Sequence, residues 1–139
     1  MKLSTRGKYG LYAMYYLAQH GGEGPQSLQS MTATGVPKQY LEQLLGNLRR
    51  AGLVSTVRGA QGGYQIAKPP EDISLLDIID AMEGPIELSE CTADESSCER
   101  SFGCPVRQVW RRLTDSINQE LSQISLSSML YAEGEEVIQ

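Results

Sequence analysis

The sequence predicts a mainly α-helical fold with one small β-hairpin and a long helix near the C-terminus. Over most of residues 4–85, apolar residues recur at intervals of three and four, which is the spacing of amphipathic helices. Two short segments within this range alternate apolar and polar residues, as half-buried strands do. After Pro105 a single apolar seam continues over roughly 20 residues, enough for about 30 Å of helix.

Three helices are predicted in the first fifty residues. The first spans 4–20, where Ser4 or Thr5 can cap the free N–H groups of the first turn. A short helix over 26–33 follows after a glycine-rich turn. The third spans 37–51 and begins at a proline, whose missing N–H would be unpaired at the first helical position anyway.

The third predicted helix has one apolar face and one polar face. Its inward-facing residues are expected to be Tyr40, Leu41, Leu44, Leu45 and Leu48. Directly after it, Gly52 can adopt the left-handed conformation that commonly ends helices. The remaining side chains of this helix are polar, so we expect them to face solvent or a polar partner.

A hairpin and a fourth helix complete the first part of the chain. Strands are predicted over 53–57 and 63–67, joined by the glycine-rich loop 58–62. The fourth helix begins after Ser74, which is a good capping residue, and ends before Gly84 and the proline that follows it. The order helix, helix, turn, helix, hairpin is that of a winged helix-turn-helix.

Charge is distributed unevenly along the chain, although the net charge is −5. Residues 1–70 carry eight basic and two acidic side chains, whereas residues 71–139 carry four basic and fifteen acidic ones. A basic half of this kind favours a polyanionic partner, here double-stranded DNA. Chance clustering of solvated charge, or a winged helix that serves as a protein-interaction module, is the alternative.

The candidate DNA-contacting residues come from three parts of the fold. The recognition helix of such a motif enters the major groove through its N-terminal residues, here Lys38, Gln39, Tyr40, Glu42 and Gln43. Gln can pair with adenine and Glu can accept from the cytosine amino group. Arg58 lies at the wing tip, where a long cation can reach a narrow minor groove. Lys2, Arg6 and Lys8 can bind phosphate.

The long C-terminal seam predicts a homodimer. Its apolar residues are Val106, Val109, Trp110, Leu113, Ile117, Leu121 and Ile124. The small N-terminal domain alone cannot cover a seam of this length, so we expect it to pair with its twofold mate. A dimer with this symmetry favours a palindromic operator. A short apolar element, residues 126–130, follows the seam.

Three cysteines, Cys91, Cys98 and Cys104, lie within 14 residues of one another with the spacing Cys-x6-Cys-x5-Cys. This spacing is looser than that of zinc ribbons, and three thiolates suit an iron–sulfur cluster with a weaker fourth ligand. A zinc site, a thiol switch and unrelated free thiols remain alternatives. The predicted organisation is therefore a DNA-binding domain over 1–85, a cluster-binding loop over 86–104, a dimerisation helix with a short element over 105–130, and a mobile acidic tail over 131–139.

Several functional classes are not expected. The N-terminus lacks the apolar core of a secretory signal, and no apolar run approaches the ~20 residues of a membrane span. We therefore expect a cytoplasmic protein with no membrane partner. The chain has one histidine, no phosphate-binding glycine loop and no Ser/His/Asp set, so an enzyme is not expected.

Five stretches resemble the IscR family of regulators, which has NsrR and CymR as relatives. They are residues 3–10, 40–44, 52–54, 57–59 and 62–64, and the likeness extends over residues 1–130. The resemblance implies a homodimer joined by the long helix, with a cluster, usually 2Fe–2S, on Cys91, Cys98 and Cys104. It also implies control of iron–sulfur assembly genes, with cluster occupancy changing which DNA sites are bound. The residues carried over as DNA contacts are Tyr40, Glu42 and Arg58. CymR-like relatives imply the alternative, a metal-free regulator that senses a partner protein or thiol redox state.

Two positions depart from the family pattern and leave the fourth ligand open. Family members usually carry a histidine three residues after the third cysteine, where this chain has Arg107. NsrR-type relatives can use an acidic residue on the first helix, where this chain has Lys8. The one histidine, His20, ends the first helix and is expected at the surface or as a cap. The nearby oxygen donors are Glu90, Asp94, Glu95 and Glu99. A hydroxide, a small thiol or a residue of the other subunit is an alternative ligand.

Overall fold

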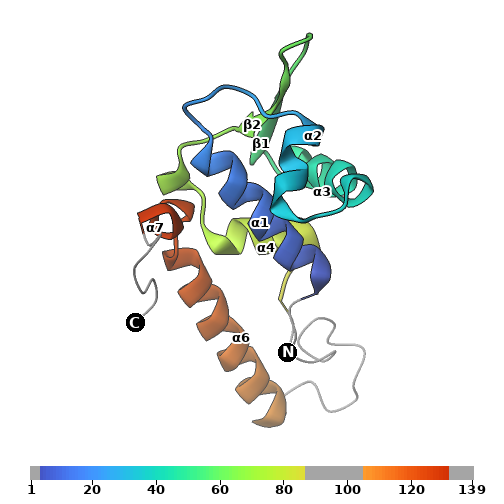
Figure 1. The fold of residues 1–139 in the computed structure, drawn as a ribbon. Helices are drawn as coiled ribbons and strands as arrows, with labels where there is room; N and C mark the ends of the chain where they lie inside the picture. Colours follow the sequence, from blue (N-terminus) through green and yellow to red (C-terminus); the bar gives the residue numbers. More distant parts are fainter. Residues whose placement is uncertain (1–3, 87–104, 132–139) are drawn as a thin grey trace.

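The computed structural model describes residues 4–86 and 105–131 as a helical domain with a two-stranded wing and a long helix (Figure 1). In chain order the elements are α1 (Thr5–Gln19), α2 (Leu28–Met31), the 3₁₀ helix η1 (Thr32–Thr34), α3 (Lys38–Arg50), β1 (Val54–Val57), β2 (Gly63–Ile66), the 3₁₀ helix η2 (Pro70–Asp72), α4 (Leu75–Glu83), α6 (Pro105–Gln123) and α7 (Leu126–Tyr131). The predicted fold class, mainly α-helical with a small β-hairpin wing, is confirmed.

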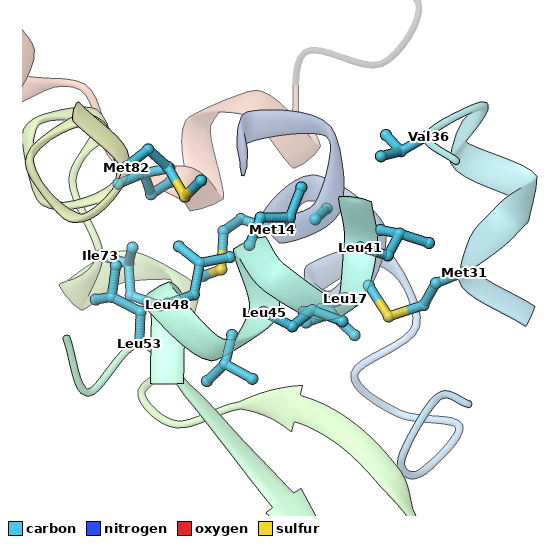
Figure 2. Close-up of a cluster of buried hydrophobic side chains, with 14 of the residues drawn as sticks. Met14, Leu17, Met31, Val36, Leu41, Leu45, Leu48, Leu53, Ile73 and Met82 are labelled. Atoms are coloured by element: carbon cyan, nitrogen blue, oxygen red, sulfur yellow. The ribbon is translucent and has the colours of Figure 1, made fainter. Parts of the chain in front are cut away.

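The core lies where α1, α3 and α4 meet. Figure 2 shows Met14 and Leu17 of α1 beside the leucines of α3, with Met82 of α4 at one end. The leucines of α3 that are buried are Leu41, Leu44, Leu45 and Leu48. The two helices α1 and α4 approach closely at Gly10, where an added Cβ would lie 2.6 Å from Cγ of Met82. Glycine at this position therefore allows close packing of the two helices.

Local capping signals set the ends of the helices. The Ser4 side chain accepts a hydrogen bond from the Gly7 N–H at 3.3 Å and caps α1. Ser74 and Asp77 form a reciprocal capping box at the start of α4. Gly52 follows α3 with φ of +80°, as expected for the residue that ends it. These contacts satisfy backbone groups that the helices cannot pair internally.

The wing is an antiparallel hairpin in which Val54 lies opposite Ile66 and Val57 opposite Gly63. Outside this pair, the backbone of Gln26 forms an isolated antiparallel bridge with Tyr64. The wing therefore rests on the segment that leads into α2. In Figure 1 the wing tip and α6 project from opposite ends of the domain.

A backbone joint connects α6 and α7 to the N-terminal core. The Leu75 N–H donates to the Ile124 carbonyl at 2.8 Å, and the Leu126 N–H donates to the Ile73 carbonyl at 2.7 Å. Leu126 is fully buried in the same core cluster as Met14. We call these paired segments, residues 73–75 and 124–126, the α6–α7 joint.

Three local predictions are corrected. The third helix was predicted to begin at Pro37, but Pro37 is extended, with ψ of 141°, and α3 begins at Lys38. The proline contributes only its carbonyl, which accepts the first hydrogen bond of the helix from the Leu41 N–H. Tyr40 was expected to face inward but is 43% exposed, since it lies at the edge of the leucine face. The 3₁₀ turn at Pro70–Asp72 was not predicted, because so short a turn has no apolar periodicity.

Candidate nucleic-acid interface

The recognition-helix candidates lie on the exposed side of α3. Because the leucines on the other side are buried in the core, the orientation of the helix is fixed. The exposed candidates are Lys38, Gln39, Tyr40, Glu42 and Gln43. The structure therefore brings all five predicted recognition residues to the solvent side of one helix, within its first two turns, as a major-groove reader requires.

An aromatic contact supports the start of α3. The rings of Tyr9 on α1 and Tyr40 meet edge to face, with centroids 5.5 Å apart and planes at 80°. Tyr9 is partly buried against the core, so it holds Tyr40 from the protein side. Sequence reasoning gave Tyr9 no role. The available signal was a stripe of tyrosines, Tyr9, Tyr12 and Tyr16, at helical spacing.

The basic candidates are exposed wherever the structure describes them. Arg58 directly follows β1 and lies in the turn of the wing. Arg6 and Lys8 lie in the first turns of α1, the helix whose Tyr9 contacts Tyr40 near the beginning of α3. Lys2 lies outside the described residues. The wing and the α1 start therefore place positive charge around the recognition helix.

Three acidic side chains, Asp77, Asp80 and Glu83, lie on α4, at the end of the domain away from the wing tip (Figure 1). Partial burial, and then the neighbouring carboxylate of Asp77, raise the pKa of the Asp80 carboxyl above its ordinary value. The Glu83 side chain accepts from the Ser4 N–H at 2.7 Å. These three carboxylates therefore lie at the opposite end of the domain from the wing tip, where they repel phosphate least, whereas Glu42 lies among the candidate residues on α3.

The long helix α6 presents an apolar stripe to solvent. The exposed fractions are 58% for Val106, 54% for Val109, 36% for Trp110 and 45% for Leu113. Arg107 and Thr114, on another side of the helix, are buried, and α6 packs against α4. Ile117, Leu121 and Ile124 are half-buried. Within residues 4–86 and 105–131, no other element therefore covers much of the apolar seam.

The predicted cluster ligands Cys91, Cys98 and Cys104 lie outside the described residues, as do Glu90, Asp94, Glu95 and Glu99. Within residues 4–86 and 105–131, no three His, Cys, Asp or Glu side chains gather as a metal site. His20 caps the end of α1, contacts Glu23 and stacks on Tyr16. Arg107 is a permanent cation and cannot donate a lone pair to a metal.

No helix in residues 4–86 and 105–131 is long and apolar enough to cross a membrane.

Comparison with known proteins finds relatives over nearly the whole chain. The Rrf2 family model, described as an iron-dependent transcriptional regulator, matches residues 3–132. The regulator CymR of Bacillus subtilis is 41% identical over 138 residues, which cover 98% of this chain and 95% of that protein. IscR of Aliivibrio salmonicida is 36% identical over 131 residues, covering 94% and 77%. The solved structure of T. potens IscR has a TM-score of 0.78 at 41% identity and covers 100% and 94%.

The two sequence relatives are both named HTH-type transcriptional regulators. The family match includes all of the described elements, from α1 to α7. The predicted resemblance to IscR and CymR is confirmed, as is the prediction of a regulator rather than an enzyme. The chain is a DNA-binding transcription regulator that belongs to the Rrf2 family.

Proposed function

We propose that this chain is a homodimeric regulator that binds a palindromic operator and senses iron–sulfur cluster status to control iron–sulfur assembly genes. The observation that carries the DNA-binding part is the exposed polar side of α3 beside a wing that presents Arg58. In this proposal the residues at the major groove are Lys38, Gln39, Tyr40, Glu42 and Gln43. Arg58 enters the minor groove, while Lys2, Arg6 and Lys8 bind phosphate.

The side chains on α3 differ in the information they can read. A glutamine amide can pair with both hydrogen-bonding groups of adenine, which suits Gln39 or Gln43. The Glu42 carboxylate is repelled by phosphate unless it finds the cytosine amino group, so it penalises sites without that donor. Lysine and arginine at the edges hold the protein in register on the backbone.

The uncovered apolar stripe of α6 supports the dimer. Val106, Val109, Trp110 and Leu113 project from a helix whose other side already packs on α4. A second copy would supply an identical stripe related by twofold symmetry, and this symmetry would match two operator half-sites. Burial of this area on association is favourable because apolar surface leaves water.

The donor set of the cysteine segment fits an iron–sulfur cluster. Cys91, Cys98 and Cys104 would hold it as thiolates, and the bound group would supply a redox-sensitive signal. Arg107, three residues after Cys104, has no lone pair for a metal, so the fourth ligand must come from elsewhere. A weaker fourth ligand favours a more labile cluster, which suits a sensor of iron supply or oxidants.

The decisive experiment is an absorption spectrum with an iron assay on protein purified without oxygen. We expect visible absorbance and bound iron, and loss of both in Cys91→Ala, Cys98→Ala and Cys104→Ala. Ser101→Ala, in the same segment, is the matched control and should keep both signals. A full iron load in all three cysteine variants would remove the ligand assignment.

A second candidate function is a metal-free regulator of the same fold that senses a partner protein or thiol redox state. The arginine at position 107 favours it, and the chain is as similar to CymR as it is to T. potens IscR, at 41% identity to each. It predicts a colourless protein after anaerobic purification. It also predicts that a thiol oxidant changes operator affinity in the wild type and has no effect in a variant lacking all three cysteines.

A further inference from the structure

Tyr16 lies where α1, α2 and the base of the wing meet. Its hydroxyl is within hydrogen-bond distance of the Ser30 carbonyl oxygen at 3.1 Å and of Oε1 of Gln26 at 3.3 Å. A phenol has one proton to donate, so these two acceptors share it. Its ring contacts the His20 ring, with centroids 4.2 Å apart and the two planes tilted by 40°. One partly buried hydroxyl thus contacts both α2 and the segment that precedes it.

Gln26 continues this connection into the wing through its backbone. The Gln26 N–H donates to the Tyr64 carbonyl, and the Tyr64 N–H donates to the Gln26 carbonyl, both at 2.8 Å. The neighbouring Gly63 has φ of +153°, and a Cβ there would lie 2.3 Å from the Gln26 carbonyl oxygen. Only glycine allows β2 to approach this closely, so the wing is fixed to Gln26.

Without the Tyr16 hydroxyl, the Gln26 side chain would keep only local contacts. Its amide nitrogen donates to the Gly24 carbonyl at 3.2 Å, and its amide oxygen accepts from the Ser30 hydroxyl at 3.4 Å. Gly24 lies in the segment before α2 and Ser30 lies in α2 itself, so neither contact connects the Gln26 side chain to α1. Among the described residues, the Tyr16 hydroxyl is therefore the group that links the first helix to the Gln26 side chain by a hydrogen bond.

We propose that Tyr16 is a positioning residue that sets the placement of the wing relative to the helix-turn-helix. The inference rests on the proposed function, in which α3 and Arg58 contact the same operator. The recognition helix and the wing must then reach the major and the minor groove at the same time. A shift at the base of the wing would therefore change whether Arg58 reaches the minor groove. Tyr16 touches no DNA and acts through Gln26 and Tyr64.

The first test compares Tyr16→Phe with Tyr12→Phe at one fixed salt concentration. Tyr16→Phe removes the hydroxyl and keeps the ring beside His20, whereas Tyr12 is 54% exposed on the same helix. We expect Tyr16→Phe to weaken binding to the specific operator by roughly three- to tenfold, the range of one net hydrogen bond. Tyr12→Phe should bind as the wild type does. Equal affinity of the wild type and Tyr16→Phe would overturn the proposal.

The second test repeats Tyr16→Phe in an Arg58→Ala background. If Tyr16 acts by placing the wing, Arg58→Ala has already removed the DNA contact that the Tyr16 hydroxyl positions. The double variant should then bind as Arg58→Ala alone does. The same fold-loss in both backgrounds would show a general structural role and overturn the inference.

A third measurement separates this inference from the proposed function because it needs no DNA. Amide hydrogen exchange at Gln26 and Tyr64 should be faster in Tyr16→Phe than in Tyr12→Phe. Unchanged exchange at both amides would overturn the role of Tyr16 whatever the affinities are. Wild-type affinity of Arg58→Ala would instead contradict the proposed wing contact, while faster exchange would still support Tyr16 as the residue that fixes the wing.

Discussion

The helices α3 and α6 are both amphipathic, yet they use their faces in opposite ways. α3 buries four leucines and presents polar side chains to solvent. α6 buries Arg107 and Thr114 and presents Val106, Val109 and Leu113. An exposed polar face at a helix start suits base edges and phosphates, whereas an exposed apolar face suits another protein surface. The kind of face left exposed therefore indicates the kind of partner.

The largest effect is expected for a substitution on the buried face of α3. Leu45 is fully buried, so Leu45→Ala should lower the free energy of unfolding by about 2–5 kcal/mol, as for other leucine cavities. Chemical denaturation measures this value. Gln43→Ala, exposed on the same helix, is the control and should leave stability nearly unchanged. A similar loss in both variants would show that α3 is not oriented as described.

The next effect concerns the apolar stripe of α6, which the other described elements leave exposed. Leu113 is 45% exposed, so Leu113→Asp should preserve the monomer fold but place a charge in the proposed seam. We expect monomers by sedimentation and a loss of about 100-fold or more in operator affinity, because two half-sites no longer bind together. Gln119→Asp, exposed elsewhere on α6, should stay dimeric. A monomeric wild type at micromolar concentration would refute the dimer.

A smaller effect is expected at the wing. Arg58→Ala should weaken binding to every specific site by about 1–3 kcal/mol, if its contact resembles other contacts to bases. Sites with A·T-rich runs at the minor groove should lose most, because they narrow that groove. Lys68→Ala removes one exposed positive charge close by in the sequence and is the matched control. Equal losses for both variants would indicate general charge attraction rather than a groove contact.

Glu42→Ala should change selectivity more than affinity. Removal of the carboxylate ends the penalty at sites without a cytosine amino group, so the variant should gain sites that the wild type rejects. Binding isotherms on a base-substituted operator panel at one salt concentration measure this. If the preference profile is unchanged, Glu42 supports the helix and does not read DNA.

The smallest effect is expected in the pH dependence of stability, through a carboxyl group on α4. The pKa of Asp80 is raised by burial and by Asp77, so ionisation is less favourable in the folded protein than in the unfolded chain. The stability associated with protonated Asp80 is present below the unfolded pKa and is lost as pH rises through the folded pKa. Asp80→Asn should therefore raise Tm slightly at neutral pH, with the gain fading in acid. Asp115→Asn on α6 is the control, and an equal gain at all pH values would contradict this cause.

Helix ends could be predicted from sequence because their causes are local. Ser4 and Ser74 cap helices with their own side chains, and Gly52 supplies the left-handed residue that ends α3. The outward placement of Tyr40 could not be predicted in the same way. It lies at the edge between two faces, and its position depends on contact with Tyr9, thirty-one residues earlier in the chain.

The orientation of α6 shows a second limit of periodicity. The repeat from Val106 to Ile124 predicts that a seam exists, but it does not tell which side of the helix meets α4. In the structure Arg107 and Thr114 are buried, and the sequence alone would not predict a buried arginine. The candidate DNA residues on α3 were easier to find, because the leucine repeat fixes both faces of that helix at once.

If the chain dimerises as proposed, the α6–α7 joint makes the spacing of the two DNA half-sites depend on the geometry of α6. Two backbone hydrogen bonds hold residues 124–126 to 73–75, so α6 acts as a stiff arm of 19 residues, about 28 Å, attached to the domain that reads DNA. In the proposed dimer, the angle at which two such arms cross sets the distance between the recognition helices. One base pair inserted between half-sites moves them apart by about 3.4 Å and turns one relative to the other. The loss of operator affinity caused by such insertions would therefore measure how stiff the two α6 helices are.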